Sequence, residues 1–219
     1  MQNSNLKDIL IVGAGGFGRE VVWLIDKINE RTPTWNVLGF LDDDCKNYGN
    51  TVGRHKVIGS CDSVLLYPDA YVICTIGASK VREKVVSNIK AIKPETKFAT
   101  LIDPDIRVVG SVSIGEGTII CSGSIVTTDI QIGEHVIVNL SCTIGHDAVL
   151  DNFVTLYPTV NISGNSHLNK CVEIGTGSQI IQGKSIGEYA IVGAGAVVVK
   201  NVPEKCVAVG VPASPIKFF

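Results

Sequence analysis

The sequence predicts a small parallel α/β domain followed by a parallel β-helix, and two observations support this prediction. Up to about residue 100, short apolar runs alternate with amphipathic stretches, which is typical of βα units. From Ile102 to Val198 an aliphatic residue recurs at every sixth position, a period that fits neither a helix nor a simple strand. We therefore expect a Rossmann-like domain over residues 1–100 and a solenoid over residues 101–219.

Five segments define the α/β part. Short β-branched runs bounded by Gly, Pro or Asp predict buried strands at 8–12, 36–41 and 70–76. Apolar residues with helical spacing predict amphipathic helices at 17–28 and 79–92. This order of strands and helices indicates a small, mostly parallel sheet.

The six-residue series is the strongest pattern in the chain, because all of its members are Ile, Val or Leu. They are Ile102, Val108, Ile114, Ile120, Val126, Ile132, Val138, Ile144, Leu150, Leu156, Ile162, Leu168, Ile174, Ile180, Ile186, Val192 and Val198. Each hexapeptide is expected to supply one short strand and one corner, so that three of them complete an 18-residue triangular coil. The series predicts between five and six such coils, with the aliphatic side chains stacked along the axis about 4.8 Å apart.

A second register supports the same interpretation. The residue four positions after each aliphatic one is almost always small or β-branched, with Ile130 and Lys184 as exceptions. Lys184 is expected to extend its stem outward or to reach a subunit interface. Cys142 occupies this inward register, so we interpret it as a core residue rather than a nucleophile.

Composition excludes several classes of protein. With 45% hydrophobic residues, 18% charged residues and a net charge of −2, the chain has no electrostatic basis for non-specific binding to nucleic acid. Its seven cysteines are scattered without a C-x-x-C pair, which favours reduced thiols in the cytoplasm over disulfides or a zinc ribbon. No apolar run approaches the length of about 18 residues that membrane insertion needs.

A glycine-rich turn, GAGGFG at residues 13–18, follows the first predicted strand and opens the first predicted helix. Gly13, Gly15, Gly16 and Phe17 are candidates for binding a substrate there, because N–H groups at a helix N-terminus suit a pyrophosphate. A domain of about 100 residues is too short for both halves of a dinucleotide site, so a nucleotide-sugar is favoured over NAD. The alternative is a tight turn that binds nothing and only lets the helix pack on the strand.

His146 is the candidate catalytic base. It lies two residues after Ile144, at an outward corner, and is followed by Asp147. An imidazole oriented by a carboxylate can remove a proton from an amine or alcohol as it attacks a thioester. A solvated corner histidine is the alternative for this residue taken alone.

Four segments together resemble bacterial sugar acetyltransferases that join a nucleotide-sugar-binding domain to a left-handed β-helix. They are GAGGFGREV at 13–21, GFLDDD at 39–44, IG at 76–77 with Arg82 after it, and NLSCTIGHD at 139–147. This group includes enzymes that N-acetylate UDP-4-amino sugars, perosamine N-acetyltransferases and sialic-acid O-acetyltransferases. The resemblance implies a left-handed β-helix, and VAVGVPA at 207–213 resembles the strand and turn that end it.

The resemblance also implies roles for individual residues. It makes His146 the general base, Asp147 its acidic partner, Asn139 an acceptor-orienting residue and Gly164 the backbone contact to the acetyl carbonyl. It further implies that Asp42 and Asp43 bind the ribose or base of the nucleotide. Two positions depart from the family: Thr155 stands where many relatives have a second histidine, and Phe17 stands where several have histidine in GGHG.

The implied acyl donor is acetyl-CoA, held in a groove between adjacent subunits of a homotrimer, with no metal required. The candidate residues for binding it are Ser163, Gly164, Thr176, Ala194, Lys200 and Lys217.

The first functional hypothesis is acetyl transfer to the amine of a nucleotide-linked amino sugar. The alternative with the same catalytic residues is O-acetylation of a sialic-acid-like sugar. A zinc-dependent β-helix protein is disfavoured because the four histidines lack a closely spaced pair, and a non-catalytic solenoid would leave both motifs unexplained.

Overall fold

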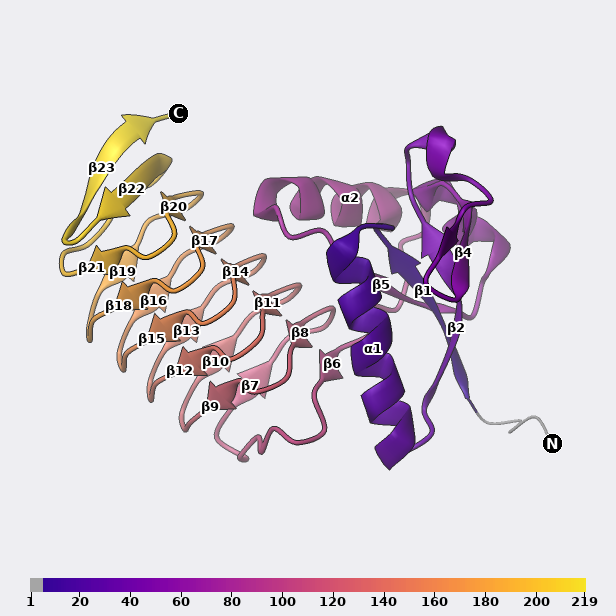
Figure 1. The fold of residues 1–219 in the computed structure, drawn as a ribbon, viewed down its shortest axis with the longest axis horizontal. Coiled ribbons are helices and arrows are strands. Elements are labelled where there is room, and N and C mark those ends of the chain that lie inside the picture. Colours follow the sequence, from indigo (N-terminus) through magenta and orange to yellow (C-terminus); the bar gives the residue numbers. More distant parts are fainter. Residues whose placement is uncertain (1–5) are drawn as a thin grey trace. The chain divides into compact units, whose positions relative to one another are not determined.

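The computed structural model describes residues 6–219, which divide into two compact units (Figure 1). The first unit comprises the described residues up to 77 together with 81–104, and the second comprises 78–80 and 105–219.

The first unit is built on a sheet whose strands follow the order β3-β4-β2-β1-β5. The four strands from β4 to β5 run parallel, and β3 pairs antiparallel with β4 at the edge. The strands are β1 (Lys7–Val12), β2 (Trp35–Leu41), β3 (Thr51–Val52), β4 (His55–Gly59) and β5 (Tyr71–Cys74). The helices are α1 (Gly16–Arg31) and α2 (Ser79–Ile92), with short 3-10 turns at Cys45–Asn47 and Cys61–Leu66, and β6 (Leu101–Ile102) follows α2.

The predicted parallel α/β fold is confirmed for this unit. The apolar run of β1 lies at the centre of the sheet, where Ile9, Leu10 and Ile11 are fully buried. Helix α1 buries Val21, Leu24 and Ile25, the apolar face that its spacing predicted. Strands β3 and β4 were not predicted, because their few residues mix polar and apolar types without a clear period.

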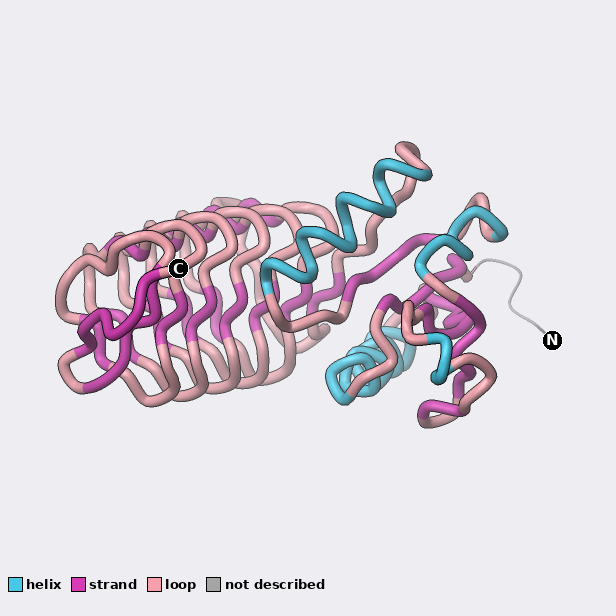
Figure 2. Tube along the Cα trace, turned by 90° about the horizontal axis from the view of Figure 1, so that it is seen from above, coloured by secondary structure: helices cyan, strands magenta, loops and turns pink. Residues whose placement is uncertain are grey.

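The second unit is a left-handed β-helix, in which each coil contributes one short strand to each of three parallel sheets (Figure 2). Sheet 1 begins with β6 and continues with β8 (Ile119–Ile120), β11 (Ile137–Val138), β14 (Thr155–Leu156), β17 (Glu173–Ile174), β20 (Ile191–Val192), β22 (Cys206–Gly210) and β23 (Ala213–Phe218). Sheet 2 contains β9 (Ile125–Val126), β12 (Thr143–Ile144), β15 (Asn161–Ile162), β18 (Gln179–Ile180) and β21 (Val197–Val198). Sheet 3 contains β7 (Ser113–Ile114), β10 (Gln131–Ile132), β13 (Val149–Leu150), β16 (His167–Leu168) and β19 (Ser185–Ile186).

The six-residue series forms the core of this unit. Paired residues are 18 positions apart, as in Ile144 against Ile162, and both side chains are buried. Full burial of each such side chain stabilises the fold by roughly 1.5–3 kcal/mol. One member departs from the series, because Val108 belongs to no strand and is 36% exposed. The regular coils therefore begin after residue 111.

The corners place non-glycine residues in the left-handed backbone region. Asp129, Asp147 and Asn165 have φ of 58°, 58° and 55°, and these three residues stack 18 positions apart. Asp and Asn tolerate this region better than other non-glycine residues, so the sequence suits the turn. At the C-terminal end, β22 continues sheet 1 in parallel and β23 folds back antiparallel on it.

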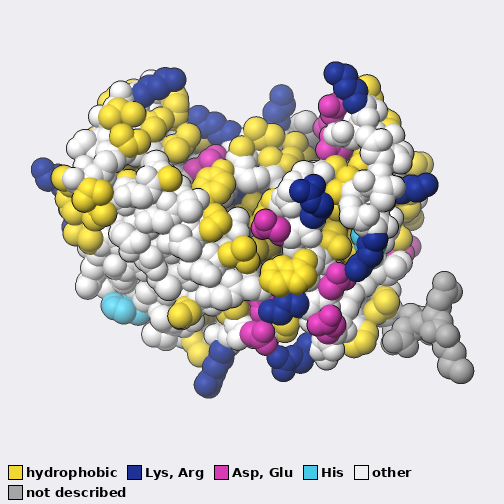
Figure 3. Space-filling model, in the orientation of Figure 1, with side chains coloured by type: hydrophobic (Ala, Val, Ile, Leu, Met, Phe, Trp, Pro, Cys, Tyr) yellow, Lys and Arg dark blue, Asp and Glu magenta, His cyan; other side chains and the backbone are white. Residues whose placement is uncertain are grey.

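The charged side chains are dispersed. On the face shown in Figure 3, Lys and Arg lie scattered among Asp and Glu, in keeping with a net charge of −2. Among the described residues, neither helix is long and apolar enough to cross a lipid bilayer.

Candidate functional site

The His146 side chain projects from a corner between sheets 2 and 3, just after β12. Asp147 adopts a φ of 58°, and its N–H donates to the Thr128 carbonyl in the preceding coil at 3.2 Å. This turn brings the Asp147 carboxylate to 2.8 Å from Nδ1 of His146, and both side chains are 53% exposed. A carboxylate can only accept, so Nδ1 is the ring nitrogen that donates this hydrogen bond. The arrangement orients the imidazole and leaves Nε2 for another partner.

Gly164 holds this imidazole from the next coil. A Cβ built on Gly164 would lie 2.6 Å from both Cε1 and Nε2 of His146, so the ring occupies the space that a side chain would need. The Asn165 N–H donates to the His146 carbonyl at 2.8 Å and fixes the two corners against each other. Within residues 6–219 the Gly164 N–H donates no hydrogen bond. The residue on which the His146 ring packs therefore has a backbone N–H that no described residue uses.

The other residues predicted for the active site fall on two different edges of sheet 2. Ser163, Gly164 and Lys200 follow strands β15 and β21, on the same edge as His146. The opposite edge, where sheet 1 meets sheet 2, carries Asn139, Thr176 and Ala194. One chain therefore does not bring the two sets together.

Asn139 lies at the start of its edge, directly after β11. Its Oδ1 accepts the Leu140 N–H at 2.7 Å, and the side chain is half-buried. This hydrogen bond holds the side-chain amide in a fixed orientation at the corner.

Thr155, Lys217, Cys142 and Lys184 lie away from the His146 corner. Thr155 is fully buried on β14 in sheet 1, so its hydroxyl is inaccessible to an acceptor. Lys217 lies on β23, with its Nζ 5.8 Å from the centre of the Phe219 ring. Burial raises the pKa of the Cys142 thiol to about 11, which suits a core residue and not a nucleophile. Lys184 is half-buried.

The first unit contains a cavity of about 360 Å³ at the carboxyl ends of β1, β2 and β5. This is the edge of a parallel sheet at which ligands usually bind. Of the residues predicted to bind a nucleotide, Gly13, Gly15, Asp42 and Asp43 line it. Gly16 and Phe17 begin helix α1 and are not part of the lining. No side chain caps the N-terminus of α1, whose N-cap residue is Gly15.

Asp42 and Asp43 already have partners in this cavity. The Asp42 carboxylate accepts the N–H of Ala14 at 3.2 Å and that of Asp44 at 2.9 Å, so it ties the glycine-rich turn to the end of β2. Asp43 accepts the Cys61 N–H at 2.9 Å. Burial, and then the hydrogen bond to Asp43, raises the pKa of the Cys61 thiol, which stays neutral. Two carboxylates and a thiol favour a ligand part that donates hydrogen bonds, such as ribose hydroxyls or base N–H groups.

Some residues of these sites were missed in the sequence. Thr128 lies one coil before His146, and Thr75 donates its hydroxyl to the carbonyls of Val12 and Gly13 at 2.9 and 3.0 Å. The 18-residue period gave a signal for Thr128, because it stands 18 positions before His146. No signal was available for Thr75.

A second histidine–carboxylate pair lies on sheet 3, where His167 Nε2 is 3.1 Å from Asp151 Oδ2. His167 belongs to strand β16 and not to a corner. This pair offers a comparison for His146 and Asp147.

Potential metal-ligating atoms gather at one place among the described residues, where Glu116, Glu134 and His135 have ligand atoms within 4.8 Å of one another. Glu116 and Glu134 lie after β7 and β10, at the corner that follows sheet 3. This is a different edge of the β-helix from that of His146.

The described residues therefore combine an exposed histidine–carboxylate pair on a hexapeptide β-helix with a ligand-sized cavity in an α/β unit. The chain matches the PglD N-terminal domain family over residues 8–89. It is 30% identical over 189 residues to GDP-perosamine N-acetyltransferase of Escherichia coli O157:H7, with 84% of this chain and 82% of the relative covered.

Two solved structures extend the comparison. The acetyltransferase domain of PglB from Neisseria gonorrhoeae FA1090, in complex with acetyl coenzyme A, has a TM-score of 0.85 at 30% identity and covers 97% of this chain and 100% of its own. PerB from Caulobacter crescentus, in complex with CoA and GDP-perosamine, has a TM-score of 0.86 at 26% identity over 96% of this chain and 97% of its own. The protein belongs to the family of bacterial sugar N-acetyltransferases that join a PglD-type N-terminal domain to a left-handed β-helix.

Proposed function

We propose that this protein transfers the acetyl group of acetyl-CoA to the amino group of a nucleotide-linked amino sugar, with His146 as the general base. The observation that carries the proposal is the geometry of the His146 corner. Its imidazole is oriented by Asp147 at 2.8 Å and packs on a glycine. The related proteins that bind acetyl coenzyme A, or CoA with GDP-perosamine, support the choice of both substrates.

The reaction needs no covalent enzyme intermediate. The sugar amine attacks the thioester carbonyl carbon, forming a C–N bond, while Nε2 of His146 takes the proton that the nitrogen loses. The Gly164 N–H donates to the oxyanion of the tetrahedral intermediate. The C–S bond then breaks, and the proton passes from the imidazolium to the leaving CoA thiolate. Asp147 stabilises the imidazolium between the two proton transfers.

The cavity of the first unit is proposed to hold the nucleoside part of the acceptor. Asp43 and the neutral Cys61 thiol face this cavity, and the uncapped N-terminus of α1 adjoins it. The N–H groups there suit the phosphate next to the nucleoside, and the carboxylates suit the ribose hydroxyls.

The complete site is proposed to form between two copies of the chain in a homotrimer. The two sets of candidate residues lie on opposite edges of sheet 2, so neither edge is a complete site. A second copy that presents its Asn139 edge to the His146 edge of the first would complete it, and three copies related by a three-fold axis would make three equal sites. Thr176 and Ala194 of one copy would then contact the CoA that Ser163, Gly164 and Lys200 of the other hold.

Release of CoA provides the primary test. Wild-type protein, His146→Ala and Asp147→Asn are compared with UDP-, GDP- and dTDP-linked amino sugars and with free sialic acids. Loss of His146 is expected to lower kcat by about 100-fold or more, because general base catalysis contributes roughly 10²–10⁴-fold. His167→Ala is the matched control, since His167 also pairs with a carboxylate but lies on a strand.

The result with each acceptor distinguishes the hypotheses. Turnover that is confined to free sialic acids would replace N-acetylation by O-acetylation. Full activity of His146→Ala would refute the assignment of the base. Binding of neither acetyl-CoA nor a nucleotide-sugar in a calorimeter would indicate a non-catalytic solenoid.

Mixed oligomers test the shared site. Asn139→Ala and His146→Ala chains are co-expressed with different tags, and the hybrids are purified by both tags. If each site uses Asn139 of one copy and His146 of the next, about one of the three sites in each purified hybrid trimer regains both residues. Hybrids no more active than the separate variants would contradict a site between subunits.

A further inference from the structure

The β-helix begins with an unpaired strand edge. In sheet 3 the first coil is joined to the second by hydrogen bonds. The N–H groups of Ser113 and Gly115 donate to the carbonyls of Ile130 and Ile132, at 3.0 and 2.9 Å. The equivalent bonds in sheet 2 would join the segment 105–111 to the carbonyls of Ser124 and Val126. The described residues form no such bonds, and 105–111 is not a strand. The carbonyl edge of β9 is therefore left without backbone partners.

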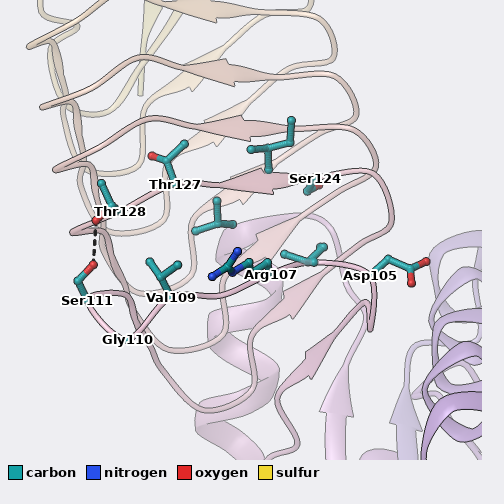
Figure 4. Close-up of a pocket in the computed structure, with 11 residues that line it drawn as sticks. Asp105, Arg107, Val109, Gly110, Ser111, Ser124, Thr127 and Thr128 are labelled. Atoms are coloured by element: carbon teal, nitrogen blue, oxygen red, sulfur yellow. Dashed lines mark hydrogen bonds between the residues drawn. The ribbon is translucent and has the colours of Figure 1, made fainter.

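A cavity of about 660 Å³ lies between this segment and β9. It is lined by apolar side chains that include Ile106, Val109 and Ile125, and by the hydroxyls of Ser111 and Thr128, which are 2.9 Å apart. Its volume lies within the range of roughly 300–1,000 Å³ typical of small-molecule sites. In Figure 4 the Arg107 guanidinium extends along the cavity toward Val109, and the Asp105 carboxylate points away.

The cavity adjoins the catalytic corner. Thr128 lines it, and the carbonyl of Thr128 accepts the N–H of Asp147 at 3.2 Å. Strand β9, which precedes Thr128, pairs directly with β12, which precedes His146. Neighbouring strands are about 4.8 Å apart, so the backbone of Thr128, which lines the cavity, lies one strand spacing from the backbone of His146.

The chemistry of the lining selects a class of ligand. Arg107 is exposed and forms no ion pair within residues 6–219, so its guanidinium is available to a phosphate. The free carbonyls of Ser124 and Val126 accept hydrogen bonds from hydroxyls. Apolar side chains suit the carbon face of a sugar ring. A pyranose joined to a phosphate combines all three features.

We propose that this cavity is the subsite for the sugar ring and the sugar-proximal phosphate of the acceptor, with Arg107 as the residue that binds the phosphate. The inference rests on the proposed function, since it places the amine to be acetylated beside His146. It adds the part of the site that distinguishes a diphosphate-linked sugar from a free one.

Separate Michaelis constants for the two substrates test the subsite. Arg107→Ala is expected to raise the KM for the nucleotide-linked amino sugar about 10-fold or more, because it removes a charge-assisted contact to phosphate. Arg107→Lys should recover part of this loss. Ile125→Trp fills the cavity from a side chain that is 57% exposed, so it should weaken the acceptor without unfolding the coil.

Acetyl-CoA and a distant cation provide the controls. The KM for acetyl-CoA should stay within about two-fold in all three variants, because none of them changes a residue proposed to bind acetyl-CoA. Lys170→Ala removes a cation from another corner of the β-helix and should leave both constants unchanged. For a free amino sugar without phosphate, Arg107→Ala should have no effect.

The outcomes separate this inference from the proposed function. If wild-type protein turns over the nucleotide-sugar, and Arg107→Ala and Ile125→Trp keep its KM, the subsite is refuted and the function stands. If no acceptor is turned over, calorimetry with a sugar nucleotide decides. If wild-type protein binds the sugar nucleotide and Arg107→Ala does not, the subsite stands and the proposed function is refuted. If Arg107→Ala binds it as well as wild type does, or if wild type does not bind it, the subsite is refuted too.

Discussion

Replacement of Gly164 by alanine tests whether the position of the His146 ring controls the rate. The new Cβ would lie 2.6 Å from Cε1 and Nε2, which is about 0.8 Å short of the 3.4 Å at which ordinary contact begins. Gly164 does not have a positive φ, so its backbone accepts alanine without strain. The ring is the part that must move, and it must move by close to 1 Å.

This displacement predicts a large kinetic effect. A misplacement of about 1 Å costs on the order of 100-fold in rate, so kcat of Gly164→Ala is expected to fall by about that factor. The assay is CoA release at saturating concentrations of both substrates, with thermal unfolding measured in parallel. The KM for the acceptor should change much less than kcat, because the sugar-binding residues are untouched.

Gly183→Asn is the matched control, at the corner of the following coil. Gly183 has a φ of 69°, and a Cβ there would meet nothing within 4 Å. Asp129, Asp147 and Asn165 occupy the same register with positive φ, so asparagine suits this position. The reasoning would be refuted if Gly164→Ala kept the wild-type kcat, or if Gly183→Asn lost as much activity.

Three further predictions follow from single side chains. Asp42→Asn loses one of two acceptor oxygens for the Ala14 and Asp44 N–H groups, so the KM for the nucleotide-sugar should rise with kcat little changed; an unchanged KM would contradict its role in positioning the turn. Of seven free cysteines only Cys45 is exposed, so a thiol reagent should label one site rapidly in native protein and seven after unfolding, and rapid labelling of several would contradict the burial. Burial, and then the charge of Arg54, lowers the pKa of His55 from its ordinary value of 6.5. The folded state therefore favours the neutral imidazole, so the contribution of His55 to the free energy of unfolding is complete above pH 6.5 and is lost as the pH falls below that value. Urea unfolding of wild type and His55→Gln should show the steeper loss in wild type, and equal slopes would refute this.

Local patterns in the sequence determined much of the fold. The six-residue period predicted the β-helix because every coil repeats the same inward positions, so no knowledge of distant contacts was needed. Helices α1 and α2 were predicted from their amphipathic spacing for the same reason. The prediction failed at Val108, because that residue keeps the period while its segment forms no strand.

The candidate site was determined by sequence only in part. The sequence by itself identified His146 and Asp147, since adjacent residues at a corner are within reach of each other. Tertiary structure alone showed that the His146 ring packs on Gly164, because the 18-residue period aligns these two residues but does not set the direction of the ring. Only the structure showed that the Asp42 carboxylate accepts the Ala14 N–H, because this contact joins residues 28 positions apart with no period between them. Only the structure showed the cavity beside β9, because the sequence does not reveal that residues 105–111 form no hydrogen bonds with the edge of this strand. Periodicity fixes which residues face inward, but only the stacked coils decide which side chains meet at a corner.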